Sequence, residues 1–203
     1  MRIGITGSHG TGKTTLAEAL ARRTGLPLIE EQARAVAQAL GIATVKTLKN
    51  DPKLGAGFQW ACLNQQLEAE KLLGFVSDRT TIDNAVYWLK YHSHRWPSEA
   101  TNAYYQQALG NVKNYDLIIY VPPEFAPEDD GFRGTDRGQQ LEVDTYIRAF
   151  LALTEADFIT VGGTLEQRLE KALGAIKEVY YQKMIRLACA KKKDRDERFV
   201  RAR

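Results

Sequence analysis

Cysteine and long apolar runs are the scarcest features of this sequence. The two cysteines, Cys62 and Cys189, lie far apart in the chain and suggest neither a disulfide framework nor a metal site. No hydrophobic stretch approaches the roughly 20 residues that a membrane-spanning helix needs, so we expect no membrane partner. The first strand already begins at Arg2, which leaves no room for a signal peptide. Together these features predict a protein of the reducing cytoplasm.

Motifs of several other protein classes are also missing from the sequence. His92 and His94 have no Cys, Asp or Glu in a metal-ligating pattern, which argues against a zinc site. No Asn-Lys-x-Asp motif follows a late strand, so the usual mark of guanine-specific switches is lacking. A ring-forming ATPase with its helical lid domain needs more chain than these 203 residues. No segment has the pattern of a coiled-coil seam, and the oligomeric state stays open.

The composition is that of an ordinary globular protein, but the charge is unevenly distributed. Hydrophobic residues make up 44% of the chain and charged residues 26%, which fits one large domain with a buried core. The net charge is +3, although residues 182–203 alone carry a larger positive excess. We therefore expect a mildly acidic kinase-like domain, residues 1–181, and a basic helical tail, residues 182–203. The tail has three acidic and nine basic residues, the latter being Lys183, Arg186, Lys191, Lys192, Lys193, Arg195, Arg198, Arg201 and Arg203.

A phosphate-binding loop is the most specific motif in the sequence. Residues 7–14 match G-x-x-x-x-G-K-[ST] without a mismatch, between an apolar β-branched stretch and a run of helix formers. Glycines let backbone N–H groups turn towards phosphates, and a helix N-terminus adds positive partial charge. Lys13 can reach the β- and γ-phosphates, and the Thr14 hydroxyl can bind Mg²⁺. We therefore predict binding of ATP and Mg²⁺, with ATP held by Gly7, Ser8, His9, Gly10, Thr11, Gly12, Lys13, Thr14 and Thr15.

Strand and helix patterns alternate along the rest of the chain. This alternation predicts a three-layer α/β fold of the P-loop NTPase type, with a five-stranded parallel sheet and helices on both faces. The strands are expected at residues 2–6, within 25–31, and at 75–78, 115–121 and 157–161. The helices are expected at residues 15–23, 31–40, 58–73, 81–91, 98–109, 139–153 and from 164 onward, with a loop at 42–57 that has room for a short turn of helix.

Polar residues follow the first three predicted strands, at the edge where parallel sheets bind ligands. Asp78 follows the third strand, where it either orients Mg²⁺ through water or caps the next helix. Glu30 or Glu31, after the second strand, suits a ribose hydroxyl or a metal-bound water, and Arg34 suits an anionic part of an acceptor. The alternative for these three is an exposed ion pair and pairing with the helix dipole. Arg79 either binds a substrate hydroxyl or phosphate or forms a surface ion pair.

With these motifs the chain resembles small P-loop kinases of the nicotinamide-riboside-kinase-like type. That group is related to nucleoside and nucleotide kinases and has a P-loop domain similar to that of AAA-type ATPases. The similarity covers about residues 1–178. It rests on the phosphate loop, Glu30-Glu31-Gln32-Ala33-Arg34, Ser77-Asp78-Arg79-Thr80-x-x-Asp83, and Asp130-Gly131-x-Arg133 leading to Asp136-Arg137.

The resemblance implies a phosphotransferase that moves the γ-phosphate of ATP to a nucleoside, a nucleotide or a nicotinamide-riboside-like acceptor. It further implies that Asp78 accepts the proton of the attacking hydroxyl, and that residues 162–164 lie near the adenine. Asp83 is expected to support Arg79 instead of taking part in the chemistry.

A polar, glycine-rich segment at about residues 124–142 is interpreted as a lid. It contains Arg133 and Arg137, which share a face if the segment becomes helical. A closing lid would deliver at least one of them to the developing transition-state charge, whereas the alternative is a solvated loop. The predicted catalytic residues are therefore Lys13, Asp78, Arg133 and Arg137. The predicted metal ligands are Thr14 and Asp78, and the predicted substrate-binding residues are Glu30, Glu31, Arg34 and Arg79.

The acceptor itself is not identified by the sequence. A small molecule is favoured, whose base would stack on an aromatic residue of the central helices or be read by a glutamine, unless these residues belong to the core. The aromatic candidates are Trp60, Tyr87, Trp88, Tyr91, Trp96, Tyr104 and Tyr105, and the glutamines are Gln59, Gln65 and Gln66. Two other functions stay open: a kinase that holds nucleic acid through residues 182–203, and a regulatory module that binds or hydrolyses ATP without being a kinase.

Overall fold

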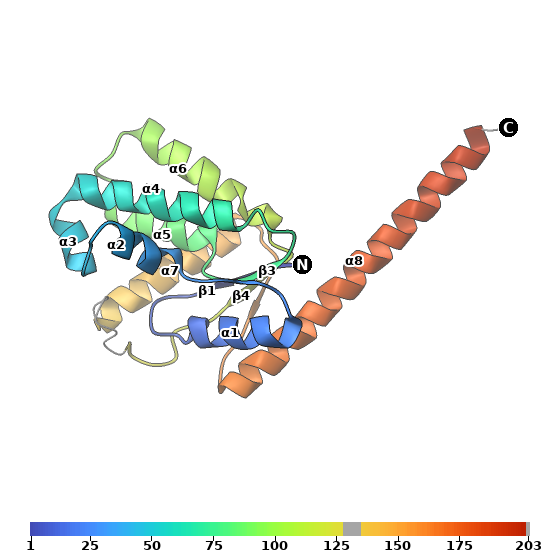
Figure 1. Cartoon of the computed structure of the whole chain (residues 1–203), viewed down its shortest axis with the longest axis horizontal. Helices are drawn as coiled ribbons and strands as arrows, with labels where there is room; N and C mark the ends of the chain where they lie inside the picture. Colours follow the sequence, from blue (N-terminus) through green and yellow to red (C-terminus); the bar gives the residue numbers. More distant parts are fainter. Residues whose placement is uncertain (128–134, 202–203) are drawn as a thin grey trace.

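The computed structural model of the chain (Figure 1) describes residues 1–127 and 135–201. Five parallel strands form one sheet in the order β2-β3-β1-β4-β5, which confirms the predicted α/β fold. The strands are β1 (Arg2–Thr6), β2 (Leu28–Ile29), β3 (Phe75–Asp78), β4 (Leu117–Tyr120) and β5 (Phe158–Thr160). The helices are α1 (Lys13–Thr24), α2 (Gln32–Ala39), α3 (Val45–Asn50), α4 (Pro52–Ala69), α5 (Thr81–Tyr91), α6 (Ser98–Gly110), the short 3₁₀ turn η1 (Val112–Asn114), α7 (Arg137–Leu153) and α8 (Leu165–Arg201).

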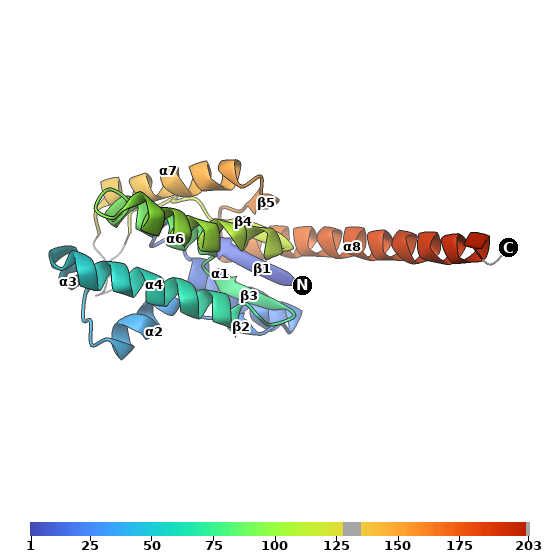
Figure 2. The same ribbon diagram turned by 90° about the horizontal axis from the view of Figure 1, so that it is seen from above.

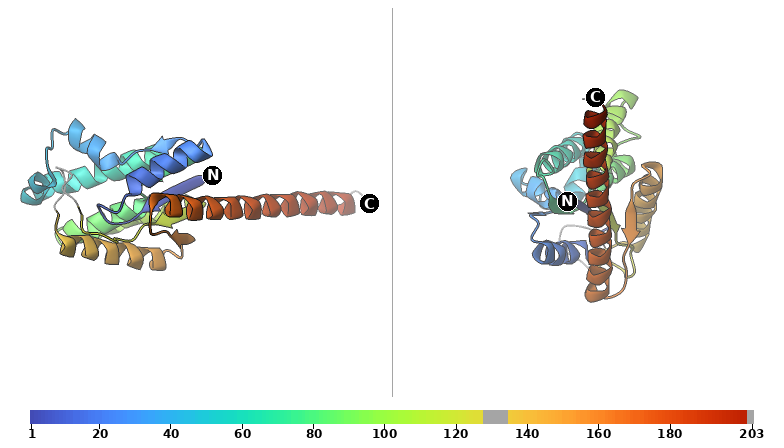
Figure 3. Two further views of the ribbon diagram at one scale, coloured as in Figure 1. Left: turned by 90° about the horizontal axis from the view of Figure 1, so that it is seen from below. Right: turned by 90° about the vertical axis from the view of Figure 1, so that its right-hand side faces the viewer.

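Helices cover both faces of the sheet, and the alternation of side chains along each strand explains how. In β4, Leu117 and Ile119 pack with α1 and the start of α8, whereas Ile118 and Tyr120 pack with α4, α5, α6 and α7. The two helical layers are seen from two further sides in Figures 2 and 3. Because both faces are covered, the central strand β1 is apolar throughout its interior, with Ile3 and Ile5 fully buried.

The predicted loop at residues 42–57 is wrong in part, because helix α3 and the beginning of α4 lie there. Asp51 and Pro52 start a helix and do not belong to a loop. The Asp51 side chain accepts hydrogen bonds of 3.0 Å from the backbone N–H groups of Lys53 and Leu54, and Pro52 occupies the first turn. Helix α4 therefore begins six residues before the predicted start at Phe58.

Helix α8 is 37 residues long and continues without a break past residue 181. Its first turns pack against α1. Further along α8, Lys183 forms an ion pair of 2.8 Å with Asp116, the last contact that we describe between α8 and the rest of the domain. Beyond it the helix projects into solvent, away from the end of the sheet where the strands terminate (Figures 1 and 2). Among the helices of the described chain, none is both long and apolar enough to cross a membrane.

Candidate active site

The phosphate loop joins β1 to α1, and its glycines adopt backbone conformations that other residues rarely reach. Gly7 has φ +153°, and a Cβ atom there would lie 2.3 Å from the Val121 carbonyl oxygen. Gly12, with φ +80°, is the N-cap of α1, so the loop turns directly into the helix N-terminus. Lys13 is buried, and its Nζ donates to the Ser8 carbonyl oxygen at 2.5 Å. The loop thus presents a cradle of backbone N–H groups with a cation inside it.

Thr14 and Asp78 meet where α1 begins and β3 ends. The Thr14 hydroxyl donates a hydrogen bond of 2.6 Å to Asp78 Oδ2. Asp78 Oδ1 is buried, and none of the described residues donates to it. A hydroxyl and a carboxylate with one oxygen left for a further partner fit Mg²⁺, which is usually held by one or two protein oxygens and by substrate phosphates. No group of three or more His, Cys, Asp or Glu side chains with metal-binding geometry occurs among the described residues.

Arg79 is the centre of a buried ion-pair network beside the loop. Its Nε donates to Glu31 Oε1 at 2.9 Å, and its Nη1 donates to Asp83 Oδ1 at 2.8 Å and to the Gly7 carbonyl oxygen at 3.3 Å. Burial alone would lower the pKa of Arg79, but Glu31, Tyr87, Asp83 and Asp78 raise it well above its ordinary value, so the guanidinium stays charged.

The backbone of Arg79 is itself unusual, with φ +103° in a residue that has a side chain. Such strain persists only where the surroundings fix the residue, and it concentrates at functional sites. Asp83 provides part of this fixation. Its Oδ2 accepts from the backbone N–H and the hydroxyl of Thr80, both at 3.0 Å, while its Oδ1 holds Arg79. Asp83 thus contacts Arg79 in the supporting position predicted from the sequence.

The two carboxylates after β2 are not equivalent. Glu31 is largely buried and bridges two arginines, with Arg79 at 2.9 Å and Arg34 at 3.5 Å. Glu30 is exposed, and its backbone oxygen accepts from the Gln32 side chain. Glu31 lines the cavity described next, and Glu30 does not. The Arg34 side chain is half exposed and pairs with Glu31, and it does not line the cavity.

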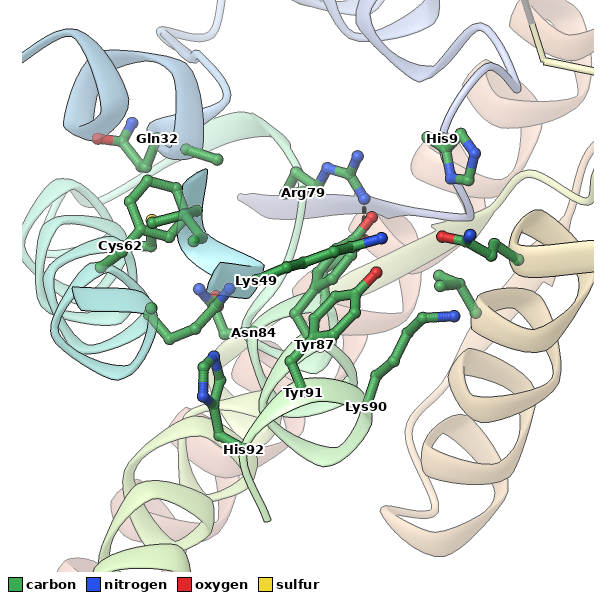
Figure 4. A pocket seen from close by; sticks show the side chains of 18 of the residues that line it. His9, Gln32, Lys49, Cys62, Arg79, Asn84, Tyr87, Lys90, Tyr91 and His92 are labelled. Atoms are coloured by element: carbon green, nitrogen blue, oxygen red, sulfur yellow. Dashed lines mark hydrogen bonds and ion pairs between the residues drawn. The ribbon is translucent and has the colours of Figure 1, made fainter. Parts of the chain in front are cut away.

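A cavity of about 630 Å³ opens beside the phosphate loop. His9 of the loop, Glu31 and Arg79 form one side of it, and the remainder comes from α2, α3, α4, α5, the turn after α5, and α7. Figure 4 shows the polar ends of Lys49, Tyr91 and Lys90 directed towards the space next to Arg79 and His9. Its volume is within the range of pockets for small molecules. The loop and the cavity therefore adjoin at the carboxyl ends of the strands, where ligands are expected in this fold class.

The aromatic candidates divide between the cavity and the core. Tyr87 and Tyr91 line the cavity and stack on each other, with ring centroids 6.3 Å apart and planes inclined by 13°. Trp88 and Tyr104 are fully buried and stack in the core instead. Burial and the neighbouring Tyr87 and Glu142 raise the pKa of Tyr91, which therefore keeps its hydroxyl proton at neutral pH.

The glutamine candidates divide in the same way. Gln59 and Gln66 line the cavity, whereas Gln65 is exposed on α4. Gln66 is tied down, because its Nε2 donates to Glu70 at 2.6 Å and to the Ser77 hydroxyl at 2.8 Å. The sequence did not single out Lys49, Asn84 or Lys90, which also line the cavity. Asn84 and Lys90 each lie three positions from Tyr87 on α5, so they share a helix face with it. This spacing could have indicated them as cavity residues from the sequence.

The predicted lid segment is only partly described by the structure. Arg133 lies outside the described residues, and Arg137 is the first residue of α7. The Arg137 guanidinium donates to the backbone oxygens of Phe125 at 2.5 Å and Pro123 at 3.1 Å, and to the side chain of Gln140. Arg137 therefore ties the chain after β4 to the start of α7. Gln140, which is fully buried, connects α7 to the phosphate loop through a 2.7 Å bond to the His9 backbone oxygen.

Arg168, in the first turn of α8, is a site residue that the sequence did not reveal. Its Nη1 donates to the Thr11 carbonyl oxygen of the phosphate loop at 2.6 Å, and its Nε donates to the Gly163 oxygen at 2.8 Å. Glu124 pairs with its Nη2 at 2.8 Å and accepts from the Gly163 N–H. This network fixes the phosphate loop to the segment after β5, where the adenine is expected.

Known structures share this fold with the chain at low sequence identity. The NadR protein in complex with NR superposes with a TM-score of 0.65 and 23% identity, over 87% of this chain and 50% of that one. Deoxyadenosine kinase from M. mycoides, with dCMP and dCDP bound, gives 0.62 and 16%, over 88% of this chain and 100% of that one. Shikimate kinase from Aquifex aeolicus vf5 gives 0.54 and 14%, over 87% and 96%. These likenesses confirm a P-loop kinase-like fold.

Comparison of the sequence with curated proteins gives no match. The model of one protein family, described as an AAA domain, matches residues 2–168. The match spans the phosphate loop, Glu31, Asp78, Arg79 and every strand of the sheet. A P-loop domain of this kind implies nucleotide binding. The chain therefore belongs to the AAA domain family.

Proposed function

We propose that the protein is a kinase that transfers the γ-phosphate of ATP, with Mg²⁺, to a hydroxyl group of a small molecule. The proposed acceptors are nucleosides, nucleotides and compounds like nicotinamide riboside. The observation that carries the proposal is the adjacency of two sites: a phosphate loop, and a separate cavity of about 630 Å³. His9, Glu31 and Arg79 line the cavity next to the loop, so a donor and an acceptor can be held side by side.

On the donor side, the loop N–H groups and Lys13 bind the phosphates of ATP. Thr14 and Asp78 would hold Mg²⁺, which would neutralise negative charge on the phosphates as it develops. We assign Asp78 to the metal site because its carboxylate accepts a hydrogen bond from Thr14 and does not line the cavity. Arg168 keeps the loop in position through the Thr11 carbonyl oxygen.

On the acceptor side, Glu31 orients the hydroxyl that attacks. A bond forms between the hydroxyl oxygen and the γ-phosphorus, the bond from that phosphorus to the β–γ bridging oxygen breaks, and ADP leaves. Glu31 takes the hydroxyl proton, because it lines the cavity next to the loop, whereas both oxygens of Asp83 accept hydrogen bonds from Arg79 and Thr80. Arg79 holds Glu31 by a 2.9 Å ion pair and contributes positive charge beside the transferred group. Arg133 and Arg137 are proposed to supply further charge from the lid.

A panel assay of ATP consumption tests this function. Nicotinamide riboside, nucleosides, nucleoside monophosphates and oligonucleotides with free hydroxyls are offered one at a time, and the phosphorylated product is identified by mass spectrometry. The expected result is ADP and a monophosphate ester with at least one small acceptor, and no product from Lys13→Ala. ATP hydrolysis that is unchanged by every acceptor would refute the kinase and favour a regulatory ATPase.

The projecting end of α8 does not favour a nucleic-acid substrate. Its basic residues lie beyond Lys183, and that end of the helix points away from the strand ends where the cavity opens (Figure 2). A nucleic-acid strand bound to the projecting end of α8 would be far from the phosphate loop. We therefore propose a small-molecule acceptor in preference to nucleic acid.

A further inference from the structure

The charged residues that line the acceptor cavity are unevenly distributed, and the difference bears on which acceptor it takes. Four lining residues are lysines or arginines: Lys49, Arg79, Lys90 and Arg95. Three lining residues are acidic: Glu31, Asp83 and Glu142. Glu31 and Asp83 both pair with Arg79 next to the phosphate loop, and Glu142 pairs with Lys90. All three carboxylates of the cavity wall are thus engaged, and none of them pairs with Lys49 or Arg95.

Lys49 and Lys90 are brought together by one aromatic ring. The Nζ atoms lie 5.7 and 5.6 Å from the centroid of the Tyr91 ring. They come from separate elements, Lys49 from α3 and Lys90 from α5. The Lys90 side chain is only 6% exposed, so this cation is built into the wall and is not a solvated surface lysine. The protonated Tyr91 hydroxyl adds a hydrogen-bond donor between them.

Arg95 lies in the turn after α5 and also lines the cavity. Burial, assisted by the nearby charge of Arg95 and by His94, lowers the pKa of His92 to about 4. His92 is therefore neutral at pH 7 and adds no charge. The imidazole of His94 accepts a 3.0 Å hydrogen bond from Arg95 Nε, which orients the guanidinium. The part of the cavity formed by Lys49, Lys90 and Arg95 against Glu142 alone has an excess of two positive charges.

The part of the cavity next to the phosphate loop has the opposite character. There, among the described residues of the cavity wall, Arg79 faces the carboxylates of both Glu31 and Asp83. This end suits an uncharged hydroxyl, which can donate its proton to a carboxylate. The stacked rings of Tyr87 and Tyr91 connect the two ends, because Arg79 lies 5.7 Å from the Tyr87 ring and the lysines lie by Tyr91.

We propose that the acceptor is an anionic hydroxyl compound, whose carboxylate or phosphate is bound by Lys49, Lys90 and Arg95 while its hydroxyl faces Glu31. The inference rests on the proposed kinase function and narrows it. It disfavours cationic acceptors such as nicotinamide riboside, because their positive ring would meet the cationic part of the cavity. Ammonium and guanidinium groups both bind carboxylates and phosphates well, so the shared chemistry is that of a small oxyanion.

Matched pairs of acceptors test the inference, because the members of each pair differ only in the anion. Two pairs test a carboxylate: orotidine is compared with uridine, and nicotinic acid riboside with nicotinamide riboside. Adenosine 3′-monophosphate is compared with adenosine for a phosphate. Turnover is measured with ATP, and binding is measured separately by calorimetry without ATP. We expect kcat/KM and affinity to favour the anionic member by about tenfold or more in at least one pair, as for one charge-assisted hydrogen bond.

Two variants attribute this preference to the residues named. Lys49→Gln and Arg95→Gln should each reduce the advantage of the anionic member about tenfold. Lys53→Gln, the same change at an exposed lysine of α4 outside the cavity lining, should not alter it. The inference is overturned if both members of every pair bind equally, or if Lys49→Gln weakens both members by the same factor. If a neutral acceptor were still phosphorylated in that case, the proposed kinase function would stand. Conversely, anion-selective binding without any phosphoryl transfer would support this site and refute the kinase.

Discussion

The Thr14 hydroxyl donates a 2.6 Å hydrogen bond to Asp78 Oδ2, although 64 positions separate the two residues in the chain. The bond joins the first turn of α1 to the last residue of β3, and β3 pairs directly with β1, the strand that precedes the phosphate loop and α1. It places the hydroxyl of the phosphate loop and the carboxylate of the neighbouring strand side by side, as the proposed Mg²⁺ site needs them. The donor half of the proposed site therefore depends on the pairing of β1 with β3.

Asp78→Asn should lower kcat by about a hundredfold or more, the usual range for loss of a positioned catalytic group. The ATP dissociation constant should change only a few-fold, because the loop N–H groups and Lys13 remain. Steady-state kinetics and an ATP titration measure the two effects. Asp157→Asn, the same change at an exposed residue, is the matched control. Near-normal turnover in Asp78→Asn would remove Asp78 from the metal site.

Glu31→Gln should lower kcat with every acceptor, by about a hundredfold, because the proton acceptor is lost. It should leave the ATP affinity unchanged, since Glu31 faces the cavity. Glu30→Gln makes the identical change one residue earlier at an exposed side chain and should retain activity. Kinetics of the two variants side by side measure the difference. If the two variants behaved alike, Glu31 would not be the proton acceptor, and Asp78 would take that role.

The position of these residues at the edge of the sheet could be predicted where a single strand or loop fixes it. Asp78, Arg79 and Glu31 could be found because each directly follows a predicted strand, and parallel strands end at one edge of the sheet. Lys49 was missed because it lies on helix α3, in the segment 42–57 that the sequence predicts to be a loop. Arg168 was missed because its partner Thr11 is 157 positions away, and nothing in a single helix indicates so distant a contact.

Arg168→Gln should raise the KM for ATP and lower the free energy of unfolding by about 1–3 kcal/mol. The reason is that a buried guanidinium which holds the Thr11 and Gly163 carbonyl oxygens and Glu124 is replaced by a shorter neutral group. ATP kinetics and urea denaturation measure both effects. Arg148→Gln, at a side chain that is 63% exposed and pairs with Asp144 within α7, should change neither. An unaltered KM for ATP in Arg168→Gln would show that Arg168 does not position the loop.

Acid should destabilise the protein partly through His92. Burial, assisted by Arg95 and His94, lowers its pKa from the ordinary 6.5 to about 4. Because the folded pKa is the lower one, the stability due to neutral His92 is present above pH 6.5 and is lost as the pH falls towards 4. Urea denaturation between pH 7 and pH 4 should show a loss of about 2 kcal/mol from this group. That loss should be absent in His92→Gln and retained in His94→Gln, and equal slopes in all three proteins would contradict it.

Removal of residues 182–203 should leave small-molecule turnover within about twofold of the full chain, as for other surface changes away from a site. The deletion breaks the ion pair between Lys183 and Asp116, but it leaves the contacts of α8 with α1 and the Arg168 network in place. Kinetics of the shortened protein measure the effect. The small-molecule assignment would be contradicted if the full chain phosphorylated oligonucleotides, with activity that falls steeply at higher salt and is absent after the deletion. Such salt dependence reports counterion release and would show that the basic tail binds phosphates.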